Sequence, residues 1–90
     1  MSDAHLHRIN EEDDVAVTFS AILPGDCVLL EGKSIHVNDR VPKFHKVSIR
    51  PVAKGHKVRK YGEYIGVATQ DIGIGEHVHI HNMKGLGKNE

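Results

Sequence analysis

Three histidines alternate with apolar residues at His77, His79 and His81. On a β-strand, side chains at this spacing lie on one face, about 7 Å apart in succession. Neutral imidazoles so placed can bind a transition metal ion or act directly as acids and bases. A complete metal site would need a further ligand from elsewhere. A polar strand face without chemistry explains the same spacing, so all three interpretations stay open.

A second candidate group is Lys60 and Tyr61, which directly precede Gly62. Glycine at this position predicts a bend in the backbone that presents both side chains. A lysine can neutralise a substrate carboxylate, and a tyrosine can donate a hydrogen bond. The alternative is a β-hairpin with Tyr61 or Tyr64 packed on the core. We favour that alternative for Tyr64, whereas for Lys60 and Tyr61 the two interpretations are balanced.

Basic residues dominate the middle of the chain, because no Asp or Glu occurs between Arg40 and Gly62. This asymmetry predicts a positive surface suited to a carboxylate, a phosphate or an acidic partner. Strand edges that lysines protect against aggregation are the plainer explanation. The basic residues are Arg40, Lys43, Lys46, Arg50, Lys54, Lys57, Arg59 and Lys60.

Composition excludes several classes of protein. The 12 Lys+Arg residues balance the 12 Asp+Glu residues, which argues against a nucleic-acid binder, and no apolar run is long enough to cross a membrane. The one cysteine, Cys27, lies in an apolar run with no histidine close in sequence, so we expect a small buried hydrophobe rather than a nucleophile. One cysteine and the lack of a secretory-type N-terminal segment predict a cytoplasmic location.

Short β-strands must position these residues. Alternation with a period of two, bounded by Gly and Pro, is typical of strands, and no segment has a helical period. The 90 residues predict one all-β domain with a small core, so chemistry would need a second chain or copy. A short helical turn near residues 42–44 is an option. The expected strands cover residues 15–19 (Val15, Val17 and Phe19 on one face), 27–30, 34–37, 45–50 (Val47 and Ile49 on one face) and 77–81.

A turn motif recurs at residues 22–28, 52–58 and 72–78. Each copy has an apolar residue, a glycine three positions later and a valine after three more. Glycine accepts the positive φ of a tight turn, so each copy predicts a turn that leads into a strand. The unequal intervals argue against a solenoid repeat. We expect flexible ends at residues 1–12 and 84–90, around a domain at 13–83.

The order of these motifs resembles the SAF domain of the altronate/galactarate dehydratase family. The resemblance covers residues 13–83 and implies a β-clip fold, as in antifreeze-like domains. One departure is Phe44, where the family pattern has glycine before His45. The most specific strings are Lys60-Tyr61-Gly62-x-x-Ile65-Gly66 and Gly75-Glu76-His77-Val78-His79-x-His81-Asn82.

The resemblance implies a small subunit or N-terminal part of a sugar-acid hydro-lyase. In such enzymes a base removes the proton α to the carboxylate, and the β-hydroxyl leaves as water. The implied partners are a larger catalytic chain and an anionic sugar acid, with a homo-oligomer as an option, and the implied cofactor is a divalent iron- or manganese-type metal. The implied roles are catalytic for His45, Lys60 and Tyr61, substrate-binding for Lys46 and Gly62, and metal-binding for His77, His79 and His81.

Other functions stay open beside the hydro-lyase. One is the small subunit of a sulfolactate-type lyase. Another is a stand-alone module that binds an anion or a metal without catalysis, which tight binding by the isolated domain would reveal. A third is a structural or oligomerisation domain, which would tolerate loss of its histidines. The lyase is favoured because of the shared motif strings, since a shared fold would not decide the function.

Overall fold

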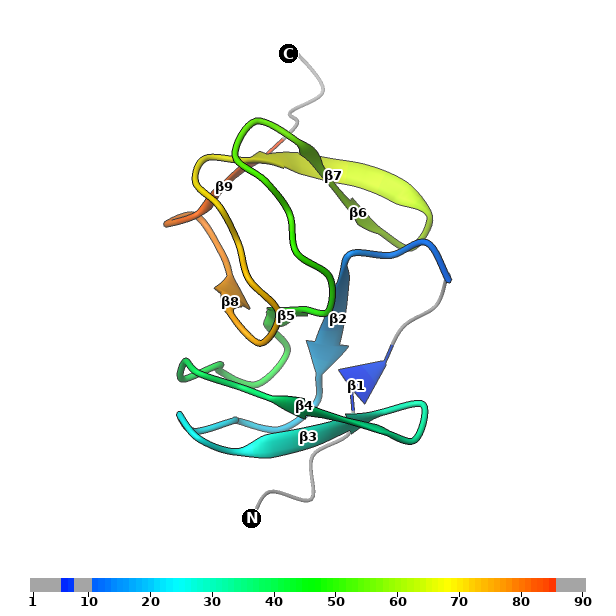
Figure 1. Ribbon diagram of the computed structural model, residues 1–90, viewed down its shortest axis with the longest axis vertical. Helices are drawn as coiled ribbons and strands as arrows, with labels where there is room; N and C mark the ends of the chain where they lie inside the picture. Colours follow the sequence, from blue (N-terminus) through cyan, green and yellow to red (C-terminus); the bar gives the residue numbers. More distant parts are fainter. Residues whose placement is uncertain (1–5, 8–10, 86–90) are drawn as a thin grey trace.

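The computed structural model describes residues 6–7 and 11–85 (Figure 1), and within these ranges it contains strands and no helix. The predicted all-β class is therefore confirmed. All strand pairs are antiparallel. The strands are β1 (Leu6–His7), β2 (Val15–Thr18), β3 (Cys27–Leu30), β4 (Lys33–His36), β5 (Lys46–Ser48), β6 (Lys57–Lys60), β7 (Glu63–Ala68), β8 (His77–Val78) and β9 (Met83–Gly85).

A central sheet in the order β1-β2-β5-β8 lies between two hairpins, as Figure 1 shows. The β3–β4 hairpin lies on one side, and the β6–β7 hairpin, extended by β9, lies on the other. Each hairpin turns through two residues with positive φ: Glu31 and Gly32 (50° and 83°), and Tyr61 and Gly62 (56° and 77°). Two successive positive φ angles define a type I′ turn, whose twist matches that of paired strands.

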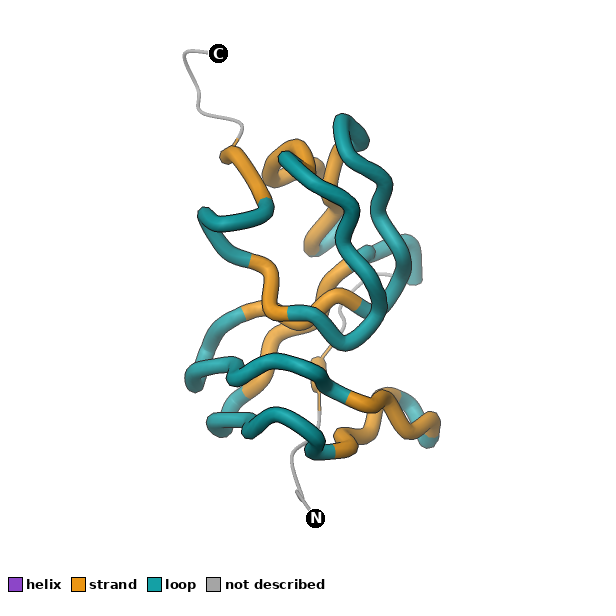
Figure 2. Tube along the Cα trace, turned by 60° about the vertical axis from the view of Figure 1, so that its left-hand side comes forward, coloured by secondary structure: helices purple, strands orange, loops and turns teal. Residues whose placement is uncertain are grey.

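Two similar halves make up the fold, each built around one hairpin. In each half two loop segments lie side by side (Figure 2), joined by one isolated bridge, Ile22 with Val41 or Val52 with Ile72. This arrangement explains the unequal spacing of the turn motif, because residues 41–47 form a fourth copy in which phenylalanine replaces glycine. The four turns therefore lead alternately to a hairpin and back to the central sheet.

The turn of this fourth copy is not the helical turn expected near residues 42–44. Phe44 has a φ of 69°, close to the 91°, 89° and 88° of Gly25, Gly55 and Gly75 in the other copies. A right-handed helical turn requires negative φ, so the expectation was wrong. The glycine positions of the motif all adopt the left-handed conformation that the sequence predicts.

Strand β2 is buried on both faces because two hydrophobic cores meet there. Val15 packs in the core beneath the β6–β7 hairpin, and Ala16 packs in the core beneath the β3–β4 hairpin. Val15 and Val17 are both buried, but the predicted strand face that they share does not extend to Phe19. The strand ends at Thr18, and Phe19 is 53% exposed.

Strand β5 and its continuation agree better with the sequence pattern. Val47 and Ile49 are both buried, as predicted for one face of residues 45–50. Ser48, on the other face, is buried as well, and its hydroxyl donates a 2.6 Å hydrogen bond to the carbonyl of Arg50. A buried hydroxyl needs such a partner, so the loop after β5 is held close to the strand.

The domain boundaries differ from the expected ones in two places. Strand β1 lies within residues 1–12 and pairs with β2, so that Leu6 joins the core. Strand β9 continues past residue 83 and pairs with β7. The remaining residues of both expected flexible ends lie outside the described residues. None of the described segments is a helix that could span a membrane.

Candidate functional site

Four imidazoles gather where β5 meets β8. Antiparallel pairing of Lys46 with Val78 brings His45, just before β5, next to the end of β8. His45 Nδ1 lies 2.9 Å from His77 Nε2. The ring of His79 stacks on that of His45, with centroids 4.8 Å apart and planes 16° apart, and His81 lies 5.4 Å from His77. The cluster therefore combines the predicted His77, His79 and His81 with His45, which is distant in sequence.

The last two histidines reach the cluster from a turn. Strand β8 ends at Val78, and residues 79–82 form a turn, so the predicted strand across 77–81 was wrong beyond its second residue. Asn82, fully buried, causes the turn because its side chain accepts from the amide of His79 at 3.0 Å and donates to the carbonyl of His77 at 2.8 Å. His77 and His79 still stack, with centroids 5.5 Å apart.

The surroundings of His77 and His79 favour the neutral forms of these two imidazoles. Desolvation lowers the pKa of His77 to about 4, with the neighbouring histidines lowering it further and Asp39 opposing them. Desolvation, His45 and Lys46 lower the pKa of His79. A hydrogen bond between two imidazoles needs one N–H donor and one bare nitrogen, so two imidazolium cations cannot form it. Neutral imidazoles can accept a proton or bind a metal.

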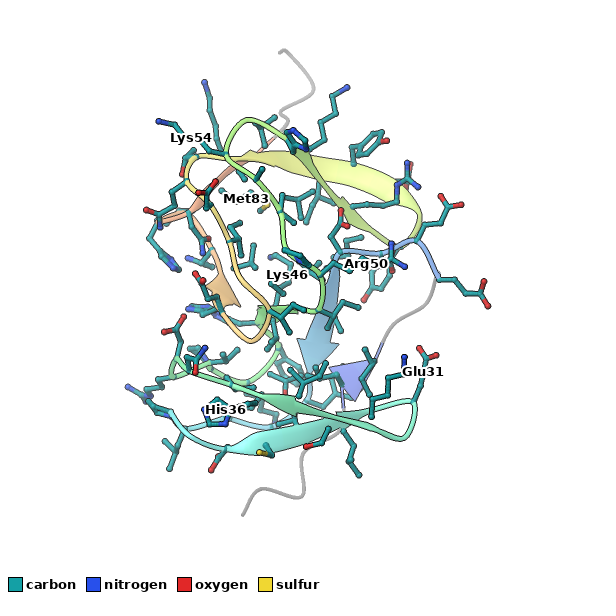
Figure 3. The ribbon with its side chains drawn as sticks, in the orientation of Figure 1. Glu31, His36, Lys46, Arg50, Lys54 and Met83 are labelled. Atoms are coloured by element: carbon teal, nitrogen blue, oxygen red, sulfur yellow. The ribbon has the colours of Figure 1, made fainter. Side chains whose placement is uncertain are left out.

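Lys46 adds a positive charge beside these rings. Its side chain points from the central sheet towards the β6–β7 hairpin (Figure 3), and desolvation together with the charge of Lys60 lowers its pKa. Within residues 6–7 and 11–85, neither ammonium has a carboxylate at salt-bridge distance. Two neighbouring ammonium groups without an acid between them create a potential that attracts an anion.

The turn between β6 and β7 presents Lys60 and Tyr61, as the glycine predicted. Tyr61 is 50% exposed, and the Lys60 ammonium lies 4.6 Å from the centre of its ring. The φ of 56° at Tyr61 costs a bulky residue about 1–2 kcal/mol. Asp13 offsets this cost, because its buried carboxylate accepts the amides of Tyr61 at 2.9 Å and Gly62 at 2.8 Å.

Two expectations for this hairpin need revision. Tyr64 does not pack on the core: it is 49% exposed and lies under the guanidinium of Arg59, which donates a 2.6 Å hydrogen bond to its hydroxyl. Gly62 has its amide engaged by Asp13, so the geometry supports a role in the turn. Its role in substrate binding stays a prediction.

Cys27 has a histidine neighbour that the sequence did not reveal. Antiparallel pairing places it opposite His36, with Sγ 3.9 Å from Nδ1. The thiol is partly exposed rather than buried, so the expectation of a buried hydrophobe was wrong. His36 lies on the β3–β4 hairpin (Figure 3), away from β6 and β7. The contact is at the long limit for a sulfur hydrogen bond, which gives little support for an activated nucleophile.

Imidazole donors fit a transition metal chemically, but they do not form a complete ligand set. In the described part of the chain, no three His, Cys, Asp or Glu side chains are arranged to hold a metal ion. Nε2 of His77 is also occupied by His45. Metal binding by His77, His79 and His81 therefore stays a prediction that requires ligands from another chain.

The imidazole cluster lies outside two clefts in the described part of the chain, each of about 660 Å³. One cleft runs along β4 to Arg50 and Ile74, and the other lies between the loops at residues 51–56 and 71–76. Volumes of this size can hold a small ligand, but neither cleft is lined by the chemically active residues. The cluster is thus an open surface that a second surface could cover.

A known protein family matches this chain over all of its described residues. The model of the altronate/galactarate dehydratase SAF domain matches residues 4–86. Altronate dehydratase of Bacillus subtilis (strain 168) is 38% identical over 77 residues, and that of Escherichia coli (strain K12) is 36% identical over 77 residues. The match covers 86% of this chain but only 16% of each altronate dehydratase.

A second kind of relative is shorter. The (2R)-sulfolactate sulfo-lyase subunit alpha of Chromohalobacter salexigens is 48% identical over 48 residues, which are 53% of this chain and 51% of that subunit. The subunit of the same name from Paracoccus pantotrophus is 43% identical over 44 residues, which are 66% of its length. The same kind of domain thus occurs within long enzymes and within a short separate subunit.

Proposed function

The chain belongs to the altronate/galactarate dehydratase SAF-domain family, and from this premise we propose that it forms part of a sugar-acid hydro-lyase. In this proposal a larger catalytic chain completes the active site. One observation carries it: four imidazoles and Lys46 stand together on an open surface, with Lys60 close enough to lower the pKa of Lys46. The small fraction of each altronate dehydratase that matches supports a larger partner.

The substrate carboxylate binds between Lys46 and Lys60. The charge of Lys60 disfavours the charged form of Lys46, so an anion placed between the two ammonium groups relieves the repulsion and is held more strongly than by one lysine. Tyr61 stands beside Lys60 with its phenol exposed and can donate a hydrogen bond to the same carboxylate or to a hydroxyl of the sugar.

His45 is the base that removes the proton α to the carboxylate. When His45 Nδ1–H donates to His77 Nε2, Nε2 of His45 keeps a lone pair and can take the proton. The low pKa of His77 keeps its ring neutral, so that one of its ring nitrogens carries no proton and can accept this hydrogen bond. The proton on His45 can then pass to the β-hydroxyl, which leaves as water, and the resulting enol tautomerises to the 2-keto-3-deoxy acid.

A bound divalent cation of the iron or manganese type would polarise the oxygens of the substrate. His79 and His81 are the residues of this chain that would hold it, with the remaining ligands supplied by the larger chain. Metal analysis of the assembled enzyme with and without His81→Ala tests this part. A metal content unaffected by the substitution would exclude His81 as a ligand.

Reconstitution tests the proposed function. The purified chain is mixed with the larger dehydratase-family chain of the same organism, and 2-keto-3-deoxy acid is measured with altronate and galactarate as substrates. We expect turnover by the mixture, and less than about 1% of it by either chain alone, because the acid–base groups and the remaining pocket lie on different chains. Full activity of the larger chain alone would contradict the proposal.

The sulfo-lyase subunits support a second candidate, elimination of sulfite from sulfolactate. The observation that favours it is the match to at least half of a short separate subunit in two organisms. The same lysines and base would serve, since both reactions remove a proton α to a carboxylate. Sulfite release from (2R)-sulfolactate by the reconstituted pair, without dehydration of sugar acids, would select this candidate.

A further inference from the structure

Phe44 occupies a turn position that three equivalent turns fill with glycine. Its φ is 69°, in the left-handed region, where bulky residues are rare. The turn is held in place, because the amide of Phe44 donates to the carbonyl of Thr18 at 2.7 Å and the amide of His45 donates to that of Pro42 at 3.0 Å. An unfavourable conformation that the surrounding structure enforces often marks a functional position.

The side chain of Phe44 is exposed to solvent and does not pack in the core. It is 63% exposed and meets the ring of Phe19 edge-on, at 6.0 Å between centroids. Leu23, 58% exposed, belongs to the same pair of loop segments, which the bridge between Ile22 and Val41 holds side by side (Figure 2). We call Phe19 and Phe44 the aromatic face. Clustered exposed aromatic residues are typical of protein–protein interfaces.

The aromatic face adjoins the imidazole cluster along the chain. Phe44 directly precedes His45, whose ring lies at hydrogen-bond distance from that of His77. A second chain that covers Phe44 therefore comes close to His45. This proximity favours an occupant that also completes the active site.

The charges around the face indicate which occupant fits. Arg40 and Lys43 are exposed, and the ammonium of Lys43 lies 4.9 Å from the centre of the Phe44 ring. The nearby Asp26 and Asp39 already accept backbone amides of this chain. In a two-fold dimer the same patch would face itself and bring these basic groups together. A different chain with acidic residues around an apolar pocket fits better.

We propose that the aromatic face is the docking surface for the larger catalytic chain, which contributes an apolar pocket bordered by Asp or Glu. This proposal rests on the proposed function, because it takes its occupant from there. It assigns Phe44 the role of an anchor that enters the pocket of the partner.

Binding measurements on matched variants test the docking surface. The probe is the larger dehydratase-family chain of the same organism, titrated calorimetrically with wild type, Phe44→Gly and Leu29→Ala. Glycine suits the turn, so we expect Phe44→Gly to keep its Tm within about 3 °C of wild type. We expect its Kd to rise at least about tenfold, as for loss of an interface anchor. Leu29→Ala, an exposed residue on β3, should stay within about twofold.

Turnover measured on the same complexes separates this proposal from the proposed function. If Phe44→Gly binds as tightly as wild type, the docking surface is wrong, whatever the activity. If wild type binds through Phe44 but the complex turns over neither sugar acids nor sulfolactate, the docking surface stands and the proposed function fails. Absence of binding by wild type overturns both. Self-association of the chain that Phe44→Gly abolishes would assign the face to a second copy instead.

Discussion

His77 is the residue whose chemistry its surroundings change most. Burial and three neighbouring imidazoles lower its pKa to about 4, and only Asp39 opposes them. The neighbouring rings come from β5 and from the turn after β8. His79 and His81 follow His77 in the chain, whereas His45 comes from another strand. The low pKa therefore depends first on burial and then on the contact between His45 and His77.

The low pKa of His77 makes stability depend on pH. Between pH 6.5 and about 4 the unfolded chain binds a proton at this residue and the folded chain does not. The free energy of unfolding should therefore fall as the pH falls through this window. Urea denaturation between pH 7 and 4.5, in the presence of a chelator, measures the effect, and His77→Gln should flatten the curve. An NMR titration midpoint near 6.5 for this ring would contradict the expectation.

The proposed roles of His45 and Lys60 predict different kinetic losses. His45→Ala removes the base, so kcat of the reconstituted enzyme should fall about 100-fold or more. Lys60→Ala removes ground-state attraction for the carboxylate, so KM should rise with a smaller change in kcat. His56→Ala and Lys54→Ala, exposed residues of the β5–β6 loop, serve as matched controls. Equal losses of activity in all four variants would contradict the roles assigned to His45 and Lys60.

At the scale of elements, tight turns decide where the functional side chains point. Asp13, just before β2, holds the β6–β7 turn through two amides. Asn82 holds the turn after β8 by accepting from the amide of His79 and donating to the carbonyl of His77. Both residues are almost completely buried, so they act by positioning their neighbours.

Loss of the Asp13 carboxylate should destabilise the domain. Asp13→Ala leaves two amides of the β6–β7 turn without their acceptor, and we expect a loss of about 2 kcal/mol in the free energy of unfolding. Asp13→Asn keeps one acceptor oxygen and should cost less. Urea denaturation of the three proteins measures the order. A stability of Asp13→Ala equal to wild type would show that water replaces the carboxylate without cost.

Two glycines of the turn motif should differ sharply in their tolerance of alanine. Gly25 and Gly75 have nearly the same φ, 91° and 88°, so the backbone cost of a side chain is shared. A Cβ at Gly25 would meet nothing within 4 Å, whereas at Gly75 it would collide with the backbone carbonyl of His36. We expect Gly25→Ala to cost about 1 kcal/mol and Gly75→Ala to cost at least about 3 kcal/mol. Similar melting temperatures for both variants would contradict the close packing of the two halves.

At the scale of the whole molecule, two half-domains share one central sheet and leave the imidazole cluster on the outside. The cores lie beneath the two hairpins, and no histidine of the imidazole cluster lines either of the two clefts. This arrangement gives the chain stability without a closed site. It explains why the proposed chemistry needs a second chain, since exclusion of water strengthens the electrostatic interactions of a site.

The open cluster predicts weak binding of substrate by the isolated chain. Two lysines in contact with solvent should hold a sugar acid with a Kd on the order of 1 mM or weaker, and added salt should weaken it further. Calorimetric titration with galactarate at two ionic strengths measures this. Tight binding that is insensitive to salt would instead favour the stand-alone binding module.

The sequence by itself determined the all-β class, the family, the bend at Gly62 and the burial of Val47 and Ile49. These features depend on local periodicity, on the backbone preferences of glycine and on motif strings, which neighbouring residues encode. The sequence also predicted that His77, His79 and His81 lie together. It placed them on one strand, whereas the structure brings them together around a turn. Asn82 was part of the recognised string, but its role in forming the turn was not apparent.

Only the tertiary structure decided which distant residues meet. His45 reaches His77 across 32 positions, and Cys27 reaches His36, because strand register brings each pair together. Burial of both faces of β2 likewise follows from its place between two cores. Register and layer order depend on the packing of the whole chain, since each strand alone is compatible with several partners. Local sequence patterns cannot select among these partners, and packing of the folded chain can.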